Sequence, residues 1–297
     1  EYFDQWKHVP QFIEDVMEFL DNVLQYFIDH APDTIARARL SAMRERSVGL
    51  GAMGFHAYLQ KNGIAFESVV AKVTNMAMFR HIRNECERAD KVLCEKRGAC
   101  PDAAAAGVGR RFSHWMAVAP NASSSLITGG TSPSIEPTRA NVFRQDTISG
   151  AHIVKNRFLK RVLAELGLDT DEVWSVLIAH DGSVQHRTDL PQQVRDVFKT
   201  AQEIDQRWII ELAADRQPYI DQGQSVNLFF APDVPIGYLH ACHFMAWKKG
   251  LKSLYYCRSD KLRKADKVGQ VAVRRRLEDE IDMRAVADDT GCLACEG

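Results

Sequence analysis

Several features that define other protein classes are missing from this 297-residue chain. No apolar run approaches the roughly 18 residues of a membrane span, because the longest runs are broken by charge, as at residues 208–211 (Trp-Ile-Ile-Glu). The first ten residues carry Glu1, Asp4 and Lys7, so no signal peptide is visible. The net charge is only −1, which gives no overall field to recruit nucleic acid or an anionic membrane. We therefore expect no membrane partner and no nucleic-acid partner.

Cysteine is sparse and odd in number. In a large chain without a secretory signal, this predicts free thiols in a reducing, cytoplasmic compartment rather than a disulfide framework. The chain also opens with Glu1 rather than Met, which we interpret as a processed product, a fragment or one piece of a split protein. The seven cysteines are Cys86, Cys94, Cys100, Cys242, Cys257, Cys292 and Cys295.

The composition, 45% hydrophobic and 26% charged, is typical of a soluble globular protein and excludes disordered, collagen-like and disulfide-stapled classes. Apolar residues at three- and four-residue spacing predict helices, and short uniformly apolar runs predict buried strands. Their alternation indicates an α/β domain with buried, largely parallel strands. We expect helices at about 9–30, 54–61, 69–97, 151–166, 170–179, 191–214 and 237–249, and strands at 115–119, 224–230 and 251–257.

The last forty or so residues differ in character from the rest. Residues 258–276 hold eight basic and two acidic side chains, whereas residues 277–297 hold seven acidic and one basic. Apolar density falls sharply after Val273, so this segment can bury little surface. We predict one folded domain at 1–257 and a flexible C-terminal tail at 258–297.

A serine-rich loop follows the predicted strand at 115–119. Its small hydroxyl side chains and free backbone N–H groups open a helix, an arrangement that suits a phosphate group. The alternative is an ordinary strand-to-helix turn with hydroxyl caps. The candidate phosphate ligands are Pro120, Asn121, Ala122, Ser123 and Ser124.

Two adjacent tyrosines, Tyr255 and Tyr256, close the last predicted strand. Neighbouring strand residues point to opposite faces, so we expect one ring to be buried and the other half-exposed. Simple aromatic packing would explain the pair. The alternative is redox chemistry, in which two phenols pass an electron and a proton along a chain. With an ordinary pKa near 10, the phenol must release its proton together with the electron.

Cys292 and Cys295 form a Cys-x-x-Cys motif that ends two residues from the C-terminus. They could form half of a zinc site, but the rest of the chain holds no second Cys-x-x-Cys. A dithiol on a tether suits thiol–disulfide exchange better. His240 and His243 share a helix face, yet no carboxylate pair with matching spacing lies nearby, so we interpret them as packing or interface residues.

Seven motifs, in this order along the chain, resemble those of the large, catalytic subunit of class I ribonucleotide reductases. The resemblance covers the chain from about residue 38 to its end. Six motifs are RSVGLG at 46–51, APNASS at 119–124, SIEP at 134–137, DGSVQ at 181–185, YIDQGQSVNL at 219–228 and HFMAWKKGLKSLYY at 243–256, and the seventh is the terminal cysteine pair.

The resemblance implies a fold and an activity. The fold would be the C-terminal half of a ten-stranded α/β barrel, that is, a five-stranded half-barrel with surrounding helices. The activity would be a thioredoxin-dependent ribonucleoside-diphosphate reductase, an oxidoreductase that makes deoxyribonucleotides by radical chemistry.

The resemblance also implies roles for particular residues. Residues 120–124 would hold the substrate diphosphate, and Tyr255 and Tyr256 would relay the radical. Cys292 and Cys295 would re-reduce the active-site disulfide. No cofactor would bind this chain directly, because a dimetal small subunit supplies the radical and thioredoxin or glutaredoxin supplies electrons.

One departure from the family pattern limits this expectation. The Asn-x-Cys-x-Glu finger loop that carries the thiyl-radical cysteine appears nowhere in the sequence. We therefore expect an incomplete catalyst that works with an N-terminal part of the large subunit and with the small subunit. The alternative is a non-catalytic interaction module that binds the radical-generating subunit. A glycyl-radical or adenosylcobalamin relative is disfavoured, because those classes need no tyrosine relay.

Overall fold

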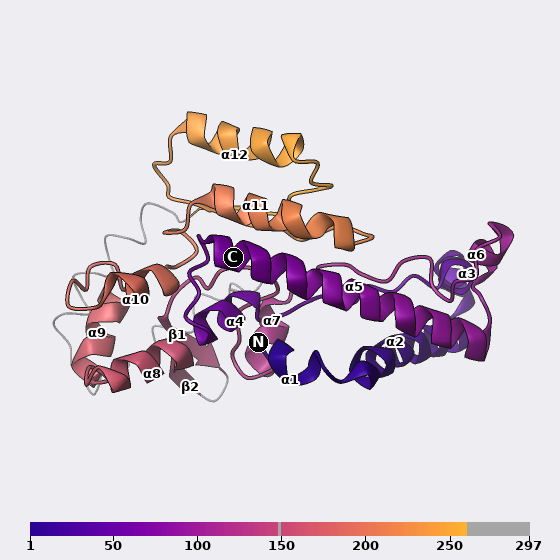
Figure 1. The fold of residues 1–297 in the computed structure, drawn as a ribbon, viewed down its shortest axis with the longest axis horizontal. Helices are drawn as coiled ribbons and strands as arrows, with labels where there is room; N and C mark the ends of the chain where they lie inside the picture. Colours follow the sequence, from indigo (N-terminus) through magenta and orange to yellow (C-terminus); the bar gives the residue numbers. More distant parts are fainter. Residues whose placement is uncertain (148–149, 260–297) are drawn as a thin grey trace.

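The computed structural model describes residues 1–147 and 150–259. The helices surround a few short strands, with the long helix α5 running through the middle of the molecule (Figure 1). The elements are α1 (Phe3–Trp6), α2 (Pro10–His30), the 3-10 helix η1 (Asp33–Ile35), α3 (Ala36–Glu45), α4 (Phe55–Lys61), α5 (Val69–Arg97), α6 (Pro101–Ala105), α7 (Ala122–Ile127), β1 (Val142–Thr147), β2 (Gly150–Lys155), α8 (Arg157–Glu165), α9 (Asp171–Ala179), α10 (Gln192–Val197), α11 (Gln206–Arg216), the 3-10 helix η2 (Gln217–Tyr219), β3 (Leu228–Phe230), α12 (Ile236–Lys248) and β4 (Cys257–Ser259).

Helix α5 has both of the end signals that its sequence predicts. Ser68 caps the N-terminus, where its hydroxyl accepts a hydrogen bond from the N–H of Ala71. Gly98 follows the last turn with a φ of +82°, a backbone region that disfavours any other residue. Helix α2 packs along α5, and α11 packs against its other side with α12 beyond (Figure 1).

Four extended segments lie side by side and run parallel. Leu50 pairs with Met116, and Val118 pairs with Gln224. The third segment continues into β3, which pairs in parallel with β4. The order across the sheet is therefore 48–51, 114–118, 222–230 and 255–259. The parallel pairing agrees with the expected α/β domain, but the strand expected at 251–257 begins only at Cys257 and is not buried.

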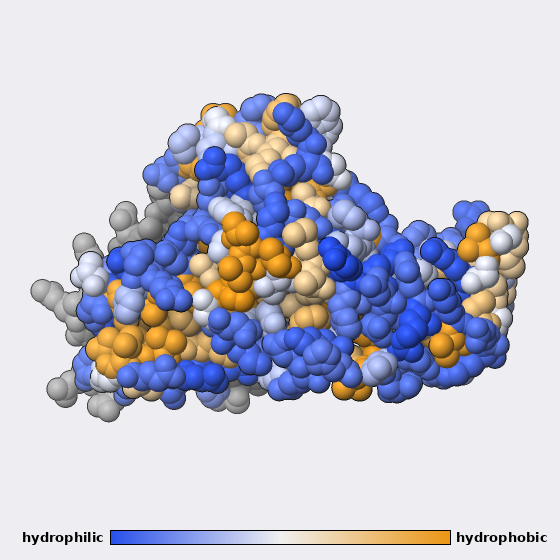
Figure 2. All heavy atoms as spheres, viewed as in Figure 1, coloured by the Kyte–Doolittle hydropathy of each residue, from blue (hydrophilic) through white to orange (hydrophobic). Residues whose placement is uncertain are grey.

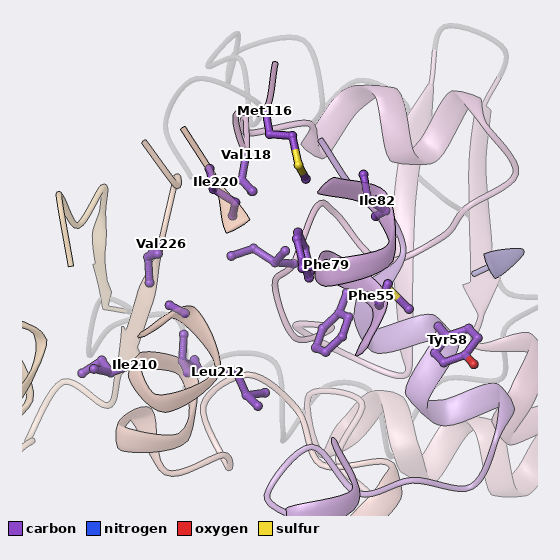
Figure 3. Packing of buried hydrophobic residues seen from close by; sticks show 14 of the residues in the cluster. Phe55, Tyr58, Phe79, Ile82, Met116, Val118, Ile210, Leu212, Ile220 and Val226 are labelled. Carbon is purple, nitrogen blue, oxygen red and sulfur yellow. The ribbon is translucent and has the colours of Figure 1, made fainter. Parts of the chain in front are cut away.

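The main hydrophobic core fills the space between these segments and the helices. Phe79 and Ile82 of α5 lie among Met116, Val118 and Val226 of the sheet (Figure 3). A second core forms beneath α8, α9 and α10, around Leu159, Trp174 and Phe198. On the surface, apolar side chains gather in separate patches between hydrophilic areas (Figure 2).

A buried carboxylate joins α2 to the end of α3 and the end of α5. Asp21 of α2 is fully buried and accepts hydrogen bonds from Arg46, Arg97 and Arg111 at 2.6–3.2 Å. Burial alone would raise the pKa of Asp21, but hydrogen bonds from the three guanidinium groups hold it below its ordinary value. Through hydrogen bonds to the Asp21 carboxylate, the cluster connects α2, the end of α5 and the strand before Met116.

Two predicted helices differ from the structure. The helix expected at 151–166 begins only at Arg157, because Asn156 caps it by accepting from the N–H groups of Phe158 and Leu159. The residues before Asn156 form β2, which pairs antiparallel with β1. The β-branched residues Ile153 and Val154 favour this strand.

The helix expected at 191–214 is two helices, α10 and α11. Asp205 starts the second one by capping the N–H of Arg207. Strand β4 includes Arg258 and Ser259, and the rest of the predicted tail, residues 260–297, lies outside the described residues. Within the described ranges, each helix is too short or too polar to cross a membrane.

Candidate functional site

The serine-rich loop lies where its sequence predicts, directly after the strand that ends at Val118. Asn121 stands at the N-terminus of α7, whose first N–H groups have no partner within the helix. Ser123 and Ser124 are exposed, whereas Ser125 is buried and its hydroxyl donates to the carbonyl of Ala122. Pro120 and Ala122 are also exposed. This geometry leaves hydroxyl and amide donors available to an anion in front of the loop.

The Asn121 side chain has a second role that the motif did not reveal. Its Oδ1 accepts a hydrogen bond of 2.6 Å from the N–H of Ser134, thirteen residues further along the chain. This bond fastens the serine loop to the segment that contains Glu136. The SIEP motif at 134–137 therefore runs beside the candidate phosphate site.

The two tyrosine rings contact each other. Their centroids are 4.1 Å apart with an angle of 54° between the ring planes. Tyr255 is 47% exposed and Tyr256 is 50% exposed, so the expectation that one ring would be buried is wrong. Hydrogen bonding to Tyr256 raises the pKa of the Tyr255 phenol.

A β-bulge just before β4 explains why the rings of two adjacent residues contact each other. In a regular parallel ladder a single residue would donate its N–H to the carbonyl of Val226 and accept from the N–H of Leu228. Here Tyr255 donates to Val226, and Tyr256 accepts from Leu228, each at 2.9 Å. Two residues thus make the hydrogen bonds that a single residue makes in a regular ladder. This pattern defines a bulge, and a bulge changes the direction in which the side chains point.

The bulge leaves the N–H of Tyr256 without a carbonyl acceptor on the neighbouring strand, and a side chain accepts it instead. Asn227 Oδ1 accepts that N–H at 3.0 Å. The amide nitrogen of Asn227 donates in turn to Glu136 Oε1 at 2.8 Å. Both Asn227 and Glu136 are buried.

Glu136 is a buried carboxyl that accepts a hydrogen bond from a neutral amide. Burial raises its pKa, against the opposing effects of the Asn227 hydrogen bond and of the charges on Arg258 and Arg139. The guanidinium of Arg258 also lies over the Tyr256 ring, 5.1 Å from its centroid. Sequence reasoning quoted the motifs that contain Glu136 and Asn227 but assigned neither residue a role.

The serine loop and the tyrosine pair flank the same central segment. Val118, which precedes the serine loop, pairs with Gln224, and Tyr255 on the other side donates to the carbonyl of Val226.

The remaining candidates are the cysteines and the histidine pair. Cys292 and Cys295 lie outside the described residues. Cys86 is buried in α5, where burial raises the pKa of its thiol to about 12. His243 hydrogen-bonds the carbonyl of Leu239 in its own helix, consistent with packing. Within residues 1–147 and 150–259, no cluster of His, Cys, Asp and Glu could hold a metal ion.

Comparison with known proteins identifies the family. A family model described as the ribonucleotide reductase barrel domain matches residues 2–104 and 102–257. The chain belongs to the ribonucleotide reductase family. This confirms the resemblance drawn from the sequence motifs, and with it the α/β barrel class of the fold.

Individual relatives agree with this assignment. The ribonucleoside-diphosphate reductase large subunit of Invertebrate iridescent virus 3 is 49% identical over 300 residues, which cover 100% of this chain and 46% of the viral protein. The Caenorhabditis elegans large subunit is 31% identical and covers 96% of this chain and 40% of its own length. This chain therefore spans about half the length of the large subunits that it matches.

A solved structure supports the same fold. The alpha subunit of the Actinobacillus ureae class Id ribonucleotide reductase superimposes with a TM-score of 0.81 at 38% identity. The match covers 90% of this chain and 49% of that subunit. The described part of this chain thus has the fold of one portion of a reductase alpha subunit.

Proposed function

We propose that this chain forms the C-terminal half of the catalytic barrel of a ribonucleoside-diphosphate reductase. The reaction would replace the ribose 2′-OH with hydrogen, release that oxygen as water and oxidise two thiols to a disulfide. Family membership supports the reaction class. The observation that carries the proposal is that the serine loop and the tyrosine pair follow segments on the two sides of the same central segment, residues 222–228.

The residues of this chain would divide the work. The N–H groups and hydroxyls at 120–124 would hold the diphosphate of the substrate. Tyr255 and Tyr256, whose rings are in contact and exposed, would carry the oxidising equivalent inward from the protein surface. Cys292 and Cys295 would return electrons to the active-site disulfide by thiol exchange.

Other parts of the enzyme would come from partners. The chain contains no Asn-x-Cys-x-Glu pattern, so the hydrogen-abstracting cysteine would come from the N-terminal part of the large subunit. A small subunit with a dimetal centre would supply the radical, and a thioredoxin or glutaredoxin would supply electrons in a reducing, cytoplasmic compartment. We propose two structural units, a barrel half at 1–257 and a tail at 258–297.

Turnover of CDP by the complete large subunit with its small subunit tests this proposal. Tyr255→Phe and Tyr256→Phe remove only a hydroxyl, so each variant should bind the small subunit normally and yet retain less than about 1% of turnover, since the relay loses its proton-coupled step. Tyr26→Phe is the matched control, because Tyr26 is an exposed tyrosine on α2. It should turn over normally.

Two outcomes would overturn the proposal. Normal turnover by both pair variants would leave the chain as an interaction module without a relay. Normal CDP reduction by this chain with only the small subunit would show that the missing finger loop is not needed.

A further inference from the structure

The bulge at the tyrosine pair depends on a buried side chain from the neighbouring strand. Asn227 Oδ1 replaces a backbone carbonyl as the acceptor for the Tyr256 N–H. Without the Asn227 oxygen, the partly buried N–H of Tyr256 would lose its acceptor, which disfavours that conformation. The bulged backbone, and with it the contact between the two rings, therefore requires the Asn227 amide in this orientation.

Glu136 fixes that orientation. An amide group can rotate by half a turn and exchange its oxygen and nitrogen. The Glu136 carboxyl accepts from the Asn227 nitrogen and so keeps the oxygen aimed at Tyr256. Both residues are almost fully buried, so water does not compete freely for either bond.

The other end of this chain of contacts reaches the serine loop. Glu136 lies two residues after Ser134, whose N–H donates to Asn121 Oδ1. Hydrogen bonds therefore link the candidate phosphate loop, through residues 134–136 and Asn227, to the backbone of Tyr256. The tyrosine pair is held relative to the substrate loop and not only relative to its own strand.

We propose that Glu136 and Asn227 are positioning residues that hold Tyr255 and Tyr256 in their contacting, bulged arrangement at the correct place relative to the substrate loop. The inference rests on the proposed function, because it assigns these residues to a radical relay. Neither residue touches the phenols' reacting oxygens in this account. Glu136 acts as a hydrogen-bond acceptor and takes no proton from the relay.

Steady-state kinetics of the complete reductase tests the proposal. Asn227→Ala and Glu136→Ala should lower kcat for CDP by 10- to 100-fold, since displacing a reacting group by about 1 Å has effects of that size. The KM for CDP should stay within about twofold. Glu136→Gln keeps an oxygen acceptor for the Asn227 amide and should retain most of kcat, whereas a proton-accepting glutamate would not tolerate this change.

A second readout does not depend on turnover. With 3-fluorotyrosine at position 256, the ¹⁹F signal should keep its chemical shift in Glu136→Gln and move toward that of free fluorotyrosine in Asn227→Ala. Asn141→Ala is the matched control: Asn141 is equally buried and donates to two backbone carbonyls, in the second core. It should destabilise the fold without moving the fluorine signal.

Three results would overturn the inference. These are an unchanged fluorine signal and kcat in Asn227→Ala, a loss in Glu136→Gln as large as in Glu136→Ala, or a rise in KM as large as the fall in kcat. Failure of the proposed function looks different. In that case Tyr256→Phe would turn over normally, and a relay role for Glu136 and Asn227 would fall with it, while the fluorine signal would still show whether Asn227 holds the ring.

Discussion

Asp21 and Glu136 are both buried carboxyl groups, but they lie in different regions and have different partners. Asp21 sits at the helical end among three guanidinium groups, and its pKa is lowered. Glu136 sits at the strand edge and accepts from a neutral amide, and its pKa is raised. The first carboxylate compensates buried positive charge, whereas the second orients a side chain.

The two carboxyl groups should therefore affect different properties of the chain: Asp21 its stability, and Glu136 its function. Removing the Asp21 charge would leave buried arginines without a counter-charge, so the fold should suffer. Removing the Glu136 charge while keeping its oxygen should leave the fold intact. The helical end is therefore a structural region, and the strand edge is the region where small changes should affect chemistry first.

The largest expected effect on stability is that of Asp21→Asn. Breaking a buried ion pair by removing one partner destabilises proteins by about 3–5 kcal/mol. Urea denaturation should show a loss of that size in the free energy of unfolding. Asp29→Asn is the matched control on the same helix, since Asp29 is exposed and should change stability by less than about 0.5 kcal/mol. Equal losses in the two variants would show that the cluster contributes nothing special.

At acidic pH, much of the stability difference between wild type and Asp21→Asn should disappear. The pKa of Asp21 is lower in the folded than in the unfolded state, so its contribution is complete above the unfolded value of about 3.9. That contribution is lost as the pH falls through the folded pKa. The stability gap between wild type and Asp21→Asn should therefore be constant from pH 5 to 7 and narrow below about pH 4. A gap that widened toward acid pH would contradict the assigned direction.

Glu136→Gln should change the free energy of unfolding in the opposite direction from Asp21→Asn, and by a smaller amount. A carboxyl whose pKa is raised in the folded state favours folding when protonated and opposes it when ionised. The neutral glutamine avoids that penalty, so at pH 7 the variant should be as stable as wild type or more stable by up to about 1 kcal/mol. Thermal and urea denaturation would measure this. A loss of more than about 2 kcal/mol would mean that the charge itself stabilises the strand edge.

The smallest expected effect is a difference in reactivity between two thiols, those of Cys86 and Cys257. Burial raises the pKa of Cys86 in α5 to about 12, whereas Cys257 in β4 is exposed. Since the thiolate is the reactive form, iodoacetamide at pH 8 should modify Cys257 and leave Cys86 unmodified until the protein is denatured. Peptide mass spectrometry would locate the label. Early labelling of Cys86 would show that the main core around α5 opens easily.

Local signals predicted much of the fold. The Ser68 cap and Gly98 set the ends of α5, and both act through neighbouring backbone groups. The β1–β2 hairpin was missed because the apolar residues Ile153 and Val154 fit a helical pattern as well as a strand. Pairing with β1 decides between them, and that contact is not local.

The site was predicted in part for the same reason. The serine loop and the tyrosine pair are each contiguous in sequence, so motifs could identify them, although their roles stay predictions. The bulge could not be predicted, because it depends on hydrogen bonds to Val226, Asn227 and Leu228. The Asn227–Glu136 bond joins residues 91 positions apart, and no spacing rule in the sequence marks it.

A structure of the complete large subunit with bound CDP would test the roles of the serine loop and the tyrosine pair. We predict that the diphosphate lies against the backbone N–H groups of residues 122–124 and that the Tyr255 and Tyr256 rings are still in contact. A diphosphate bound away from residues 120–124, or tyrosine rings separated in the assembled subunit, would contradict this prediction.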